Sequence, residues 1–464
     1  MTATGVLLSL CYVVAAILFM LCLRGLSGPQ TARRGVVLGE VGMLIAVVGT
    51  LLQREIVTYE WILAGLFAGT TIGVAISATI PMTKMPERIA LSHSFGGLAT
   101  GLVGVAEYAR EGQHLTMLKM GALGLETFLG LLTFTGSIVA FGKLQGFVRG
   151  SPITWKGQNV VNVALFFAAI AGIGVLVVRP ELTQVFFAVA AVGLVLGVTA
   201  VLPIGGADMP VVISLLNSYA GLAACATGFA LSSQILIICG ALDGSSGLLL
   251  SLLMSKAMNR SFGNVLFGAF GQTTDAPTAV TGAPTPGRSY NEATIEDVGA
   301  VLKASQTVIV VPGYGMAVSQ AQHAVRDLAA SLERRGVDVR YAIHPVAGRM
   351  PGHMNVLLAE ANVSYDRLFD LDDINDDFAR TDAVIVVGAN DVVNPAAKST
   401  PSSPIYGMPV FAVDQSRSVI VLKRSMGAGF SGVDNELFFQ PNTMMVLGDA
   451  KKTIQAMIGE MKDA

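Results

Sequence analysis

Residues 307–318 read TVIVVPGYGMAV, and this stretch decides the fold of the C-terminal part of the chain. Five β-branched residues before Pro312 predict a buried strand. Gly313 and Gly315 follow, and an apolar helical pattern begins after them. Glycines at a strand-to-helix turn permit a tight turn and a close backbone approach to a pyrophosphate. Val318 stands where a third glycine would allow closer packing, so the stretch predicts a dinucleotide site with one departure from the usual motif.

The sequence around this motif alternates short β-branched runs with helical patterns from residue 295 to residue 464. This alternation predicts an α/β domain of the Rossmann type, with a doubly wound parallel sheet. We expect strands at 307–311, 337–343, 383–387, 410–413, 418–422 and 444–447, and helices at about 316–335, 351–361, 373–380 and 449–462.

The charges near the strand ends favour NADP over NAD. The second strand ends at 343–345, where no Asp or Glu stands to hold an adenosine ribose 2′-hydroxyl. Cations occur elsewhere, with Arg349 in the next loop and Lys423 beside Arg424 at the end of the fifth strand. Adjacent cations before a glycine-containing loop suit a phosphate ester. The alternative is that Lys423 and Arg424 form a solvated surface pair.

Other polar groups of this half are expected to have simpler roles. Gly388-Ala389-Asn390-Asp391 closes a strand at the carboxyl edge, where ligands bind in open α/β sheets. We expect His323 to be an exposed helical residue and the acidic run at 370–377 to be a helix start with a solvated face. No metal site is predicted, because the cysteines lie in apolar runs without ligand spacing: Cys11, Cys22, Cys225 and Cys239.

The N-terminal half has the composition of a membrane protein. The whole chain is 52% hydrophobic with a net charge of −2 and a mean hydropathy of +0.62. Only 24 charged residues fall in the first 262 positions, against 38 in the last 202. Because soluble proteins contain about 25% charged residues, an ordinary soluble enzyme is excluded. The near-zero net charge gives no basic field, so no nucleic-acid partner is expected.

Nine apolar segments of this half are long enough to cross a bilayer, which takes about 20 residues each. One set of their loops holds ten Lys or Arg residues and the opposite set holds four. The positive-inside rule then places the N-terminus outside and the C-terminal domain in the cytoplasm. The expected spans are 4–23, 36–53, 61–80, 88–108, 119–142, 159–178, 182–202, 209–229 and 231–255.

Glycines recur at helical spacing in two of these spans. Small residues at three- or four-residue intervals let helices approach closely, so we expect tight helix packing on both glycine faces. The glycines are Gly65, Gly69 and Gly73 in one span, and Gly97, Gly101 and Gly104 in the next.

Polar side chains at membrane depth are costly there and are common on ion or proton paths. The imidazole of His93 titrates near neutrality, so it is a natural proton relay. The alternative for His93 is a hydrogen-bonded structural role. For Ser137 and Asn217 alone, the spacing favours interhelical hydrogen bonds. Glu126 and Asp243 also interrupt apolar spans.

The sequence divides into three parts. Residues 1–262 are expected to form a transmembrane proton-translocating domain, and 295–464 a cytoplasmic nucleotide-binding domain. Between them, 263–294 is rich in Gly, Pro and Thr and lacks apolar periodicity. We therefore expect a semi-flexible linker there.

Motifs along essentially the whole chain resemble those of the β subunit of proton-translocating NAD(P) transhydrogenases. The resemblance implies that the soluble half is the family's NADP(H)-binding domain. The matching segments are PGYGMAV at 312–318, HPVAGRMPGHMNVLLAEA at 344–361, VVGANDVVNPAA at 386–397, KRSMGAGF at 423–430, LGDAKK at 447–452, LSHSFGGLA at 91–99, FTGSIVAFGKL at 134–144, GGADMPVVISLLNSYAG at 205–221 and GSSG at 244–247.

The resemblance implies that NADP(H) binds in a flipped orientation under a lid at 423–430. Lys423, Arg424 and Ser425 are similar to the family's 2′-phosphate clamp. Arg349 is similar to a pyrophosphate partner. The family often has Tyr where this chain has Phe430, which removes a hydroxyl contact. Together with the glycine motif, the resemblance implies a site of Gly313, Tyr314, Gly315, Val318, Val346, Ala347, Gly348, Arg349, Met350, Pro351, Gly388, Ala389, Asn390, Asp391, Val392, Gly407, Met408, Lys423, Arg424, Ser425, Met426, Gly427, Ala428, Gly429, Phe430, Asp449 and Ala450.

The resemblance also implies a proton path and a reaction. His93, Ser137 and Asn217 match positions that the family uses along its proton path. Asp391 is similar to the carboxylate that links the nucleotide site to proton transfer. The implied reaction is NADH + NADP⁺ going to NAD⁺ + NADPH, with a proton moving inward. Proton occupancy near His93 would alter how tightly NADP(H) is held, and this linkage is reciprocal.

One dinucleotide motif is present, so NAD(H) is expected on a partner chain, the family's α subunit, without which the enzyme is inactive. We expect a dimer of αβ units in the bacterial inner membrane. An alternative of another class is an ion channel or secondary transporter with a regulatory nucleotide-sensing domain. Such sensors tend to keep an acidic residue after the second strand and to lack the loop at 423–430.

Overall fold

The computed structural model describes residues 3–462, apart from 53–58, 113–114, 151, 206–207, 258–288, 351, 402, 404 and 428–432. Two compact units make up the chain, Met1–Ser251 and Leu252–Ala464. Most of the linker expected at 263–294 lies outside the described residues.

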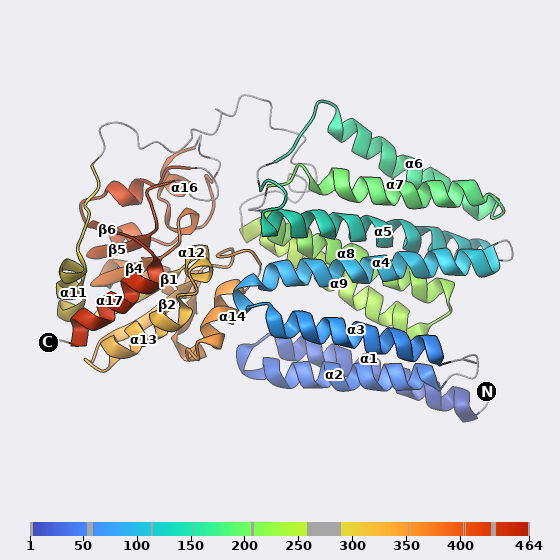
Figure 1. Ribbon diagram of the computed structural model, residues 1–464, viewed down its shortest axis with the longest axis horizontal. Coiled ribbons are helices and arrows are strands. Elements are labelled where there is room, and N and C mark those ends of the chain that lie inside the picture. The colour runs from blue at the N-terminus through green and yellow to red at the C-terminus, as the bar shows by residue number, and fades with distance from the viewer. Residues whose placement is uncertain are drawn as a thin grey trace. The chain divides into compact units, whose positions relative to one another are not determined.

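The first unit consists of long apolar helices (Figure 1). Nine helices within the described residues are long and apolar enough to cross a membrane, as the sequence predicts. The last two are separate, and Ser232 between them has a left-handed backbone angle, φ 56°. The helices are α1 Ala3–Leu26, α2 Pro29–Leu51, α3 Glu60–Thr79, the 3₁₀ turn η1 Met82–Lys84, α4 Met85–Glu111, α5 Met117–Gln145, α6 Gln158–Val178, α7 Thr183–Val201, α8 Met209–Ala230 and α9 Gln234–Ala257.

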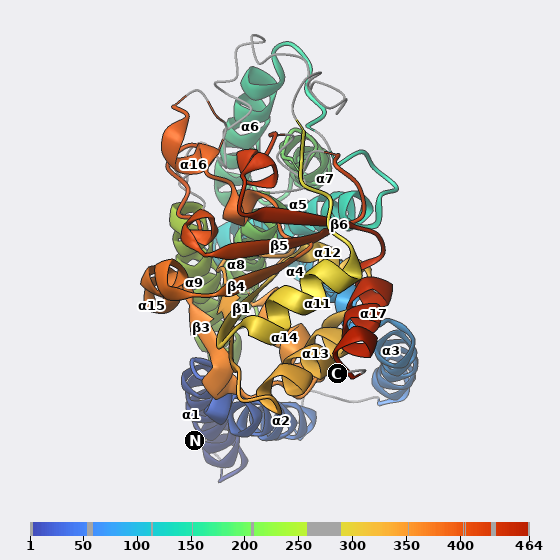
Figure 2. The same ribbon diagram turned by 90° about the vertical axis from the view of Figure 1, so that its left-hand side faces the viewer.

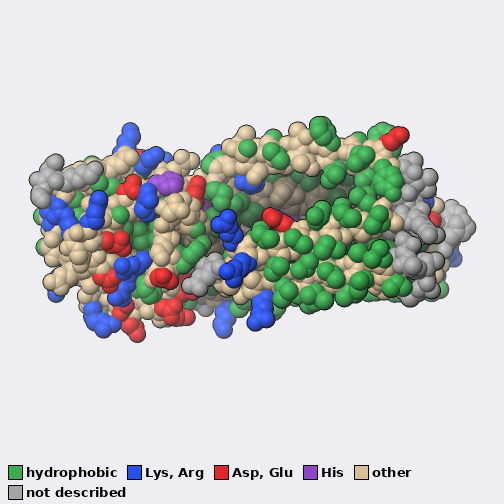
Figure 3. Space-filling model, turned by 90° about the horizontal axis from the view of Figure 1, so that it is seen from below, with side chains coloured by type: hydrophobic (Ala, Val, Ile, Leu, Met, Phe, Trp, Pro, Cys, Tyr) green, Lys and Arg blue, Asp and Glu red, His purple; other side chains and the backbone are tan. Residues whose placement is uncertain are grey.

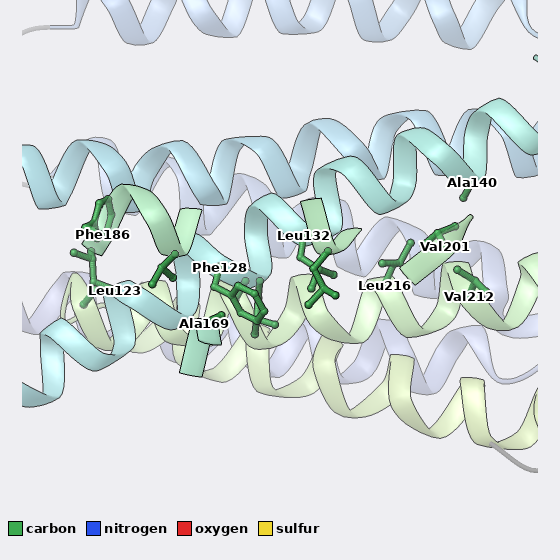
Figure 4. Close-up of a cluster of buried hydrophobic side chains, with 14 of the residues drawn as sticks. Leu123, Phe128, Leu132, Ala140, Ala169, Phe186, Val201, Val212 and Leu216 are labelled. Atoms are coloured by element: carbon green, nitrogen blue, oxygen red, sulfur yellow. The ribbon is translucent and has the colours of Figure 1, made fainter. Parts of the chain in front are cut away.

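Helix α5 forms the centre of this unit and contacts α4, α6, α7 and α8. A Cβ atom on Gly130 would lie 2.7 Å from the backbone nitrogen of Gly101, so α4 and α5 meet backbone to backbone. Apolar side chains fill the remaining space between the helices, among them Leu123, Phe128 and Leu132 (Figure 4). This packing gives the membrane unit a dense interior.

The glycine spacing predicts helix packing correctly on α4 and wrongly on α3. A Cβ atom on Gly97 would lie 2.9 Å from the carbonyl oxygen of Gly130 in α5. On α3, by contrast, no residue is buried, and the three glycines meet no described residue within 4 Å. The spacing places small residues on one face of a helix, whereas the tertiary arrangement decides whether another helix covers that face. The uncovered glycines are Gly65, Gly69 and Gly73.

The surfaces of the two units differ in chemistry. In Figure 3, hydrophobic side chains cover most of the visible surface of the helical unit, and charged side chains gather over the other unit. Large apolar side chains of the spanning helices are widely exposed, for example Trp61 at 84% and Phe67 at 77%. Such a surface suits a lipid environment.

The second unit contains a six-stranded parallel sheet with the order β3-β2-β1-β4-β5-β6. This is the strand order of a doubly wound Rossmann fold, so the predicted fold class is confirmed. The strands are β1 Thr307–Pro312, β2 Asp338–Ile343, β3 Leu368–Asp370, β4 Ala383–Val387, β5 Ser418–Lys423 and β6 Thr443–Leu447.

The helices of this unit are mostly short. Three of the longer ones, α11, α13 and α17, lie together beside the sheet (Figure 2). Elsewhere in the unit, Ile309, Val384 and Val421 of the sheet pack in one apolar cluster with Phe378 and Phe411. The helical segments are α11 Ile295–Ala304, α12 Tyr314–Val318, α13 Gln322–Glu333, α14 His353–Glu360, η5 Tyr365–Arg367, α15 Leu371–Ile374, η6 Asn375–Arg380, η7 Asp391–Val393, α16 Ala396–Ser399, η8 Val413–Gln415, η9 Glu436–Phe439 and α17 Ala450–Lys462.

Two expected elements of this unit differ from the structure. Residues 410–413 form no strand, although they are apolar. The sheet instead contains a strand that was not expected, β3, at the edge beyond β2. An apolar run shows that a segment is buried but does not show that it pairs in a sheet. The expected helix at 316–335 is broken, because Gln320 has φ 50° between α12 and α13.

Candidate functional site

The loops after β1 and β4 touch so closely that only glycine fits between them. The N–H of Gly313 donates to the Val387 carbonyl, and that of Gly315 to the Gly388 carbonyl, both at 2.9 Å. A Cβ atom on Gly315 would lie 2.6 Å from the Cα atom of Gly388, which itself has φ +64°. The G-x-G motif thus joins two strand ends at the carboxyl edge of the sheet. Val318 ends the short helix α12 with 53% of its surface exposed.

The loop after β2 brings Arg349 to the loop after β1. Its guanidinium carbon lies 4.3 Å from the centroid of the Tyr314 ring, a cation–π distance. The backbone N–H of Arg349 donates to Nδ1 of His353 at 3.1 Å. Gly348, with φ +107°, makes the turn that allows this contact. A cation is therefore held beside Tyr314 of the glycine motif, while its predicted contact with a pyrophosphate stays a prediction.

His344 connects the same loop to residues 407–410, a role that the sequence did not indicate. Its Nε2 lies 2.8 Å from the Pro409 carbonyl, and its Nδ1 accepts the Val346 N–H at 3.3 Å. These partners place the ring proton on Nε2. Burial lowers the pKa of His344 to about 4, so the imidazole is neutral at pH 7.

Two asparagines outside the predicted site hold the loop after β4. Nδ2 of Asn435 donates to the carbonyl and to Oδ1 of Asn390, both at 3.0 Å. Nδ2 of Asn394 donates to the Asp434 carbonyl at 3.1 Å. Nδ2 of Asn390 is buried and makes no hydrogen bond within the described part of the chain. It is a donor that a ligand could use.

Lys423 ends β5 at the same edge. Its Nζ lies 4.7 Å from the centroid of the Phe438 ring and donates to the carbonyl of Gly427. Burial lowers the pKa of Lys423, while the carboxylates of Asp391 and Asp434 act in the opposite direction. Lys423 is thus partly buried near Phe438, Asp391 and Asp434 and does not lie on an open surface.

The remaining predicted nucleotide residues lie on segments next to these loops. Gly407 has φ +79°, and its N–H donates to the Ala397 carbonyl at 2.8 Å. Asp449 precedes α17 and accepts the Lys452 N–H at 3.1 Å. Ala347, Ala389, Val392, Met408 and Ala450 are buried, Val346, Met350, Met426 and Gly427 are partly buried, Arg424 and Ser425 are exposed, and Pro351, Ala428, Gly429 and Phe430 lie outside the described residues.

In the membrane unit, α4 and α5 bring His93 to Ser137. Nδ1 of His93 lies 2.9 Å from the Ser137 hydroxyl oxygen. Nε2 of the same ring is buried and makes no hydrogen bond to any described residue. The structure therefore joins the first two residues of the predicted proton path, and it leaves one ring nitrogen available.

Asn217 belongs to a second pair at the same level of the bundle. Its Nδ2 donates to Oδ1 of Asp243 at 3.0 Å, and no hydrogen bond among the described residues joins it to His93 or Ser137. A Cβ atom on Gly136, next to Ser137, would lie 3.0 Å from a methyl group of Leu216, next to Asn217. The two pairs thus lie at similar depth on neighbouring helices.

Two buried charged residues of α5 lie on either side of this level. Glu126 is fully buried, and its carboxylate makes no hydrogen bond to any described residue. Nζ of Lys143 donates to the carbonyls of Leu202 and Ile204, both at 2.6 Å, just after the end of α7. The lysine satisfies carbonyls at a helix C-terminus, a role that its place in the sequence did not indicate.

The described residues contain no group of three or more His, Cys, Asp or Glu side chains that could hold a metal ion. His323 is exposed on α13, as expected. The acidic run at 370–377 starts a helical segment, and its Asp377 pairs with Arg340 at 2.7 Å.

Comparison with known proteins identifies the family. The model of the NAD(P) transhydrogenase beta subunit matches residues 8–460. The chain belongs to this family. The NAD(P) transhydrogenase subunit beta of Rhodospirillum rubrum is 47% identical over 459 residues, which cover 97% of this chain and 98% of the relative. The protein of the same name from a strain of that species matches equally well.

Membership in the transhydrogenase beta subunit family has three consequences for this chain. It is a subunit of an oxidoreductase that uses nicotinamide nucleotides. It has an alpha subunit as its partner. Together with the nine apolar helices, the family makes it a multi-pass membrane protein.

Proposed function

We propose that this subunit binds NADP(H) at the carboxyl edge of its sheet and exchanges hydride with NAD(H) bound on the alpha subunit. We further propose that inward proton movement through the helical unit drives NADPH formation. The observation that carries the first part is the convergence of Lys423, Arg349 and the glycine motif at one sheet edge.

The residues at this edge fit a dinucleotide. The buried Nδ2 of Asn390 is a donor without a protein partner within the described residues. Gly313, Gly315 and Gly388 lack side chains, so the turns after β1 and β4 stay narrow at the edge where a pyrophosphate would bind. Arg349 offers a planar guanidinium for the same group. Bound NADP⁺ would supply the hydride acceptor, and these residues would orient it toward the alpha subunit.

The selectivity proposed for NADP(H) rests on charge. The loop after β2 has no carboxylate at 344–346, and its first residue is a neutral histidine. A 2′-phosphate would meet the ammonium group of Lys423 and the guanidinium of Arg424. Asp391, whose carboxylate lies near Lys423, would then respond to the charge that the nucleotide brings.

The proton path proposed for the helical unit begins with His93. Hydrogen bonding of Nδ1 to Ser137 holds the ring, and the buried Nε2 can gain or lose a proton. Inward movement of one charge releases about 2.3 kcal/mol per 100 mV. Because the two nicotinamides have similar intrinsic potentials, the gradient supplies the drive. Asn217 continues the path beside the His93–Ser137 pair.

The location and assembly follow from the same scheme. The Lys and Arg bias of the loops supports a cytoplasmic C-terminal unit. The bacterial relatives support an inner-membrane location. We propose a flexible joint at 263–294 between residues 1–262 and residues 295–464, a dimer of alpha–beta units, and activity only when the alpha subunit is present.

Titration of the full-length subunit in detergent with NADP⁺ and NAD⁺ tests the proposal. We expect NADP⁺ to bind at least tenfold more tightly, since a hydrogen bond to a charged group contributes about 1.5–3 kcal/mol. Equal affinity for the two nucleotides would refute the assignment of the site. Reconstitution with the alpha subunit then tests whether NADH-dependent reduction of an NADP⁺ analogue responds to a proton gradient.

A further inference from the structure

Asp243 is an acidic side chain in the middle of a membrane-spanning helix. About 14 Å of α9 precedes it and about 21 Å follows, at 1.5 Å per residue. A charged side chain at the bilayer centre is energetically costly, and such residues commonly mark ion or proton paths. The side chain is nonetheless exposed on the surface of this subunit, so its retention there needs an explanation.

The hydrogen bond from Asn217 connects Asp243 to the proposed proton path. Nδ2 of Asn217 donates to Oδ1 of Asp243 at 3.0 Å. An N–H donor stabilises the ionised carboxylate, whereas the apolar surroundings stabilise the protonated acid. The surroundings of Asp243 therefore stabilise both its ionised and its protonated form, and a proton carrier must be able to adopt both forms.

The contact between α8 and α9 fixes the position of this carboxyl group. A Cβ atom on Gly221 would lie 2.2 Å from the backbone nitrogen of Gly244, so the two backbones touch. Ser218 donates to the Gly244 carbonyl at 2.8 Å, and Ser214 donates to the Gly247 carbonyl at 2.9 Å. One face of α8 is thus bonded to α9 on both sides of the Asn217–Asp243 pair.

The face of α9 that carries Asp243 borders another part of the bundle. Ile235, Cys239 and Asp243 recur every four residues and share that face. Ile235 and Cys239 pack in one cluster with Tyr12 of α1 and Ala46 of α2. Asp243 lies one turn beyond this contact, at the depth of the His93–Ser137 pair.

We propose that Asp243 is a proton-carrying residue of this subunit, held in place by Asn217. One proton forms an O–H bond with the carboxylate, and the same proton later leaves toward the other side of the membrane. No electron moves in this step. The inference rests on the proposed function, because it adds a carrier to the path that begins at His93.

The test uses the subunit reconstituted with its alpha partner in liposomes that contain a pH-sensitive dye. Asp243→Asn keeps the size and the oxygen that accepts from Asn217, but it cannot bind a proton. We expect it to lower proton flux at least tenfold, whereas Asp243→Glu keeps a substantial part. Ser245→Ala is the matched control, because among the described residues its hydroxyl donates to carbonyls of α9 itself, and it should leave proton flux unchanged.

A second reaction separates proton carriage from a structural role. Hydride can pass from NADH to retained NADP⁺ and on to an NAD⁺ analogue without net proton transfer. We expect Asp243→Asn to keep this reaction. The inference would be overturned if Asp243→Asn lost this reaction or kept normal proton flux. It would also be overturned if Asp243→Glu lost as much proton flux as Asp243→Asn. If wild-type complex performs neither reaction, the proposed function itself fails.

Discussion

Lys423 shows how a single charge acquires its role from its neighbours. In the sequence it is one of two adjacent cations at a strand end. In the structure it lies near the Phe438 ring and the carboxylates of Asp391 and Asp434, whereas Arg424 is exposed. Burial lowers the pKa of Lys423, so an anionic ligand that restores a favourable environment for the ammonium group is expected to bind strongly.

Lys423→Ala should weaken NADP(H) binding by roughly ten- to a hundredfold, since it removes a charged hydrogen-bond donor. Binding of a nucleotide without the 2′-phosphate should change much less. Isothermal titration of both nucleotides measures the difference. Arg334→Ala, which removes an exposed cation at the end of α13, is the control. If Lys423→Ala lost equal affinity for the two nucleotides, Lys423 would not be the group that holds the 2′-phosphate.

His93→Gln should abolish proton-coupled turnover while NADP(H) still binds, because the amide can bond to Ser137 but cannot carry a proton. Ser137→Ala leaves the imidazole in place and should have a smaller effect. Proton flux and nucleotide binding are measured on the same liposomes. Normal pumping by His93→Gln would remove the imidazole from the mechanism.

At the scale of elements, the loops of the second unit depend on each other more than on their own sequences. The G-x-G loop contacts the loop after β4, the loop after β2 is bonded to Pro409, and the loop after β4 is bonded to Asn435. Ligand binding by one loop therefore requires the others to be in place.

Gly315→Ala tests the contact between the two loops. The new methyl group would lie 2.6 Å from the Cα atom of Gly388, so the loops must separate. We expect loss of most NADP(H) affinity. Gly459→Ala on α17 meets nothing within 4 Å and should keep binding intact, with stability equal or slightly higher. Similar affinities in both variants would show that the loops tolerate separation.

His344 makes the loop after β2 sensitive to acid. Its pKa is lowered from 6.5 to about 4 in the folded protein, so the unfolded chain binds the extra proton first as pH falls. Stability present above pH 6.5 is lost between about pH 6.5 and pH 4, by up to about 3 kcal/mol. Melting of the second unit at pH 7 and pH 5 should show a larger drop for wild type than for His344→Gln. If the melting temperature fell equally in wild type and His344→Gln, the acid sensitivity would come from another group.

At the scale of the whole molecule, one chain joins two units whose surfaces differ in chemistry. The helical unit exposes apolar surface, and the sheet unit exposes charge (Figure 3). The described residues contain nine candidate spans. If all nine cross the membrane, the two ends of the chain lie on opposite sides, and the proposed orientation puts the nucleotide site in the cytoplasm.

The substitutions Thr2→Cys and Ala464→Cys test this topology, each made alone in a variant whose four native cysteines are replaced. We expect a membrane-impermeant maleimide to label the residue-2 cysteine in intact cells and the residue-464 cysteine only in inverted vesicles. Labelling of both from one side would mean an even number of spans.

The sequence by itself determined the nine spans, the Rossmann fold class and the type of residue at each strand end. These depend on local hydropathy, on the period of apolar positions and on turn residues, all of which act over short stretches. Only the tertiary structure decided that α3 is uncovered, that 410–413 does not pair, and that His344 and Asn435 support the site. It also decided that Asn217 meets Asp243. Such pairings join residues far apart in the chain, and which faces meet depends on how whole elements pack.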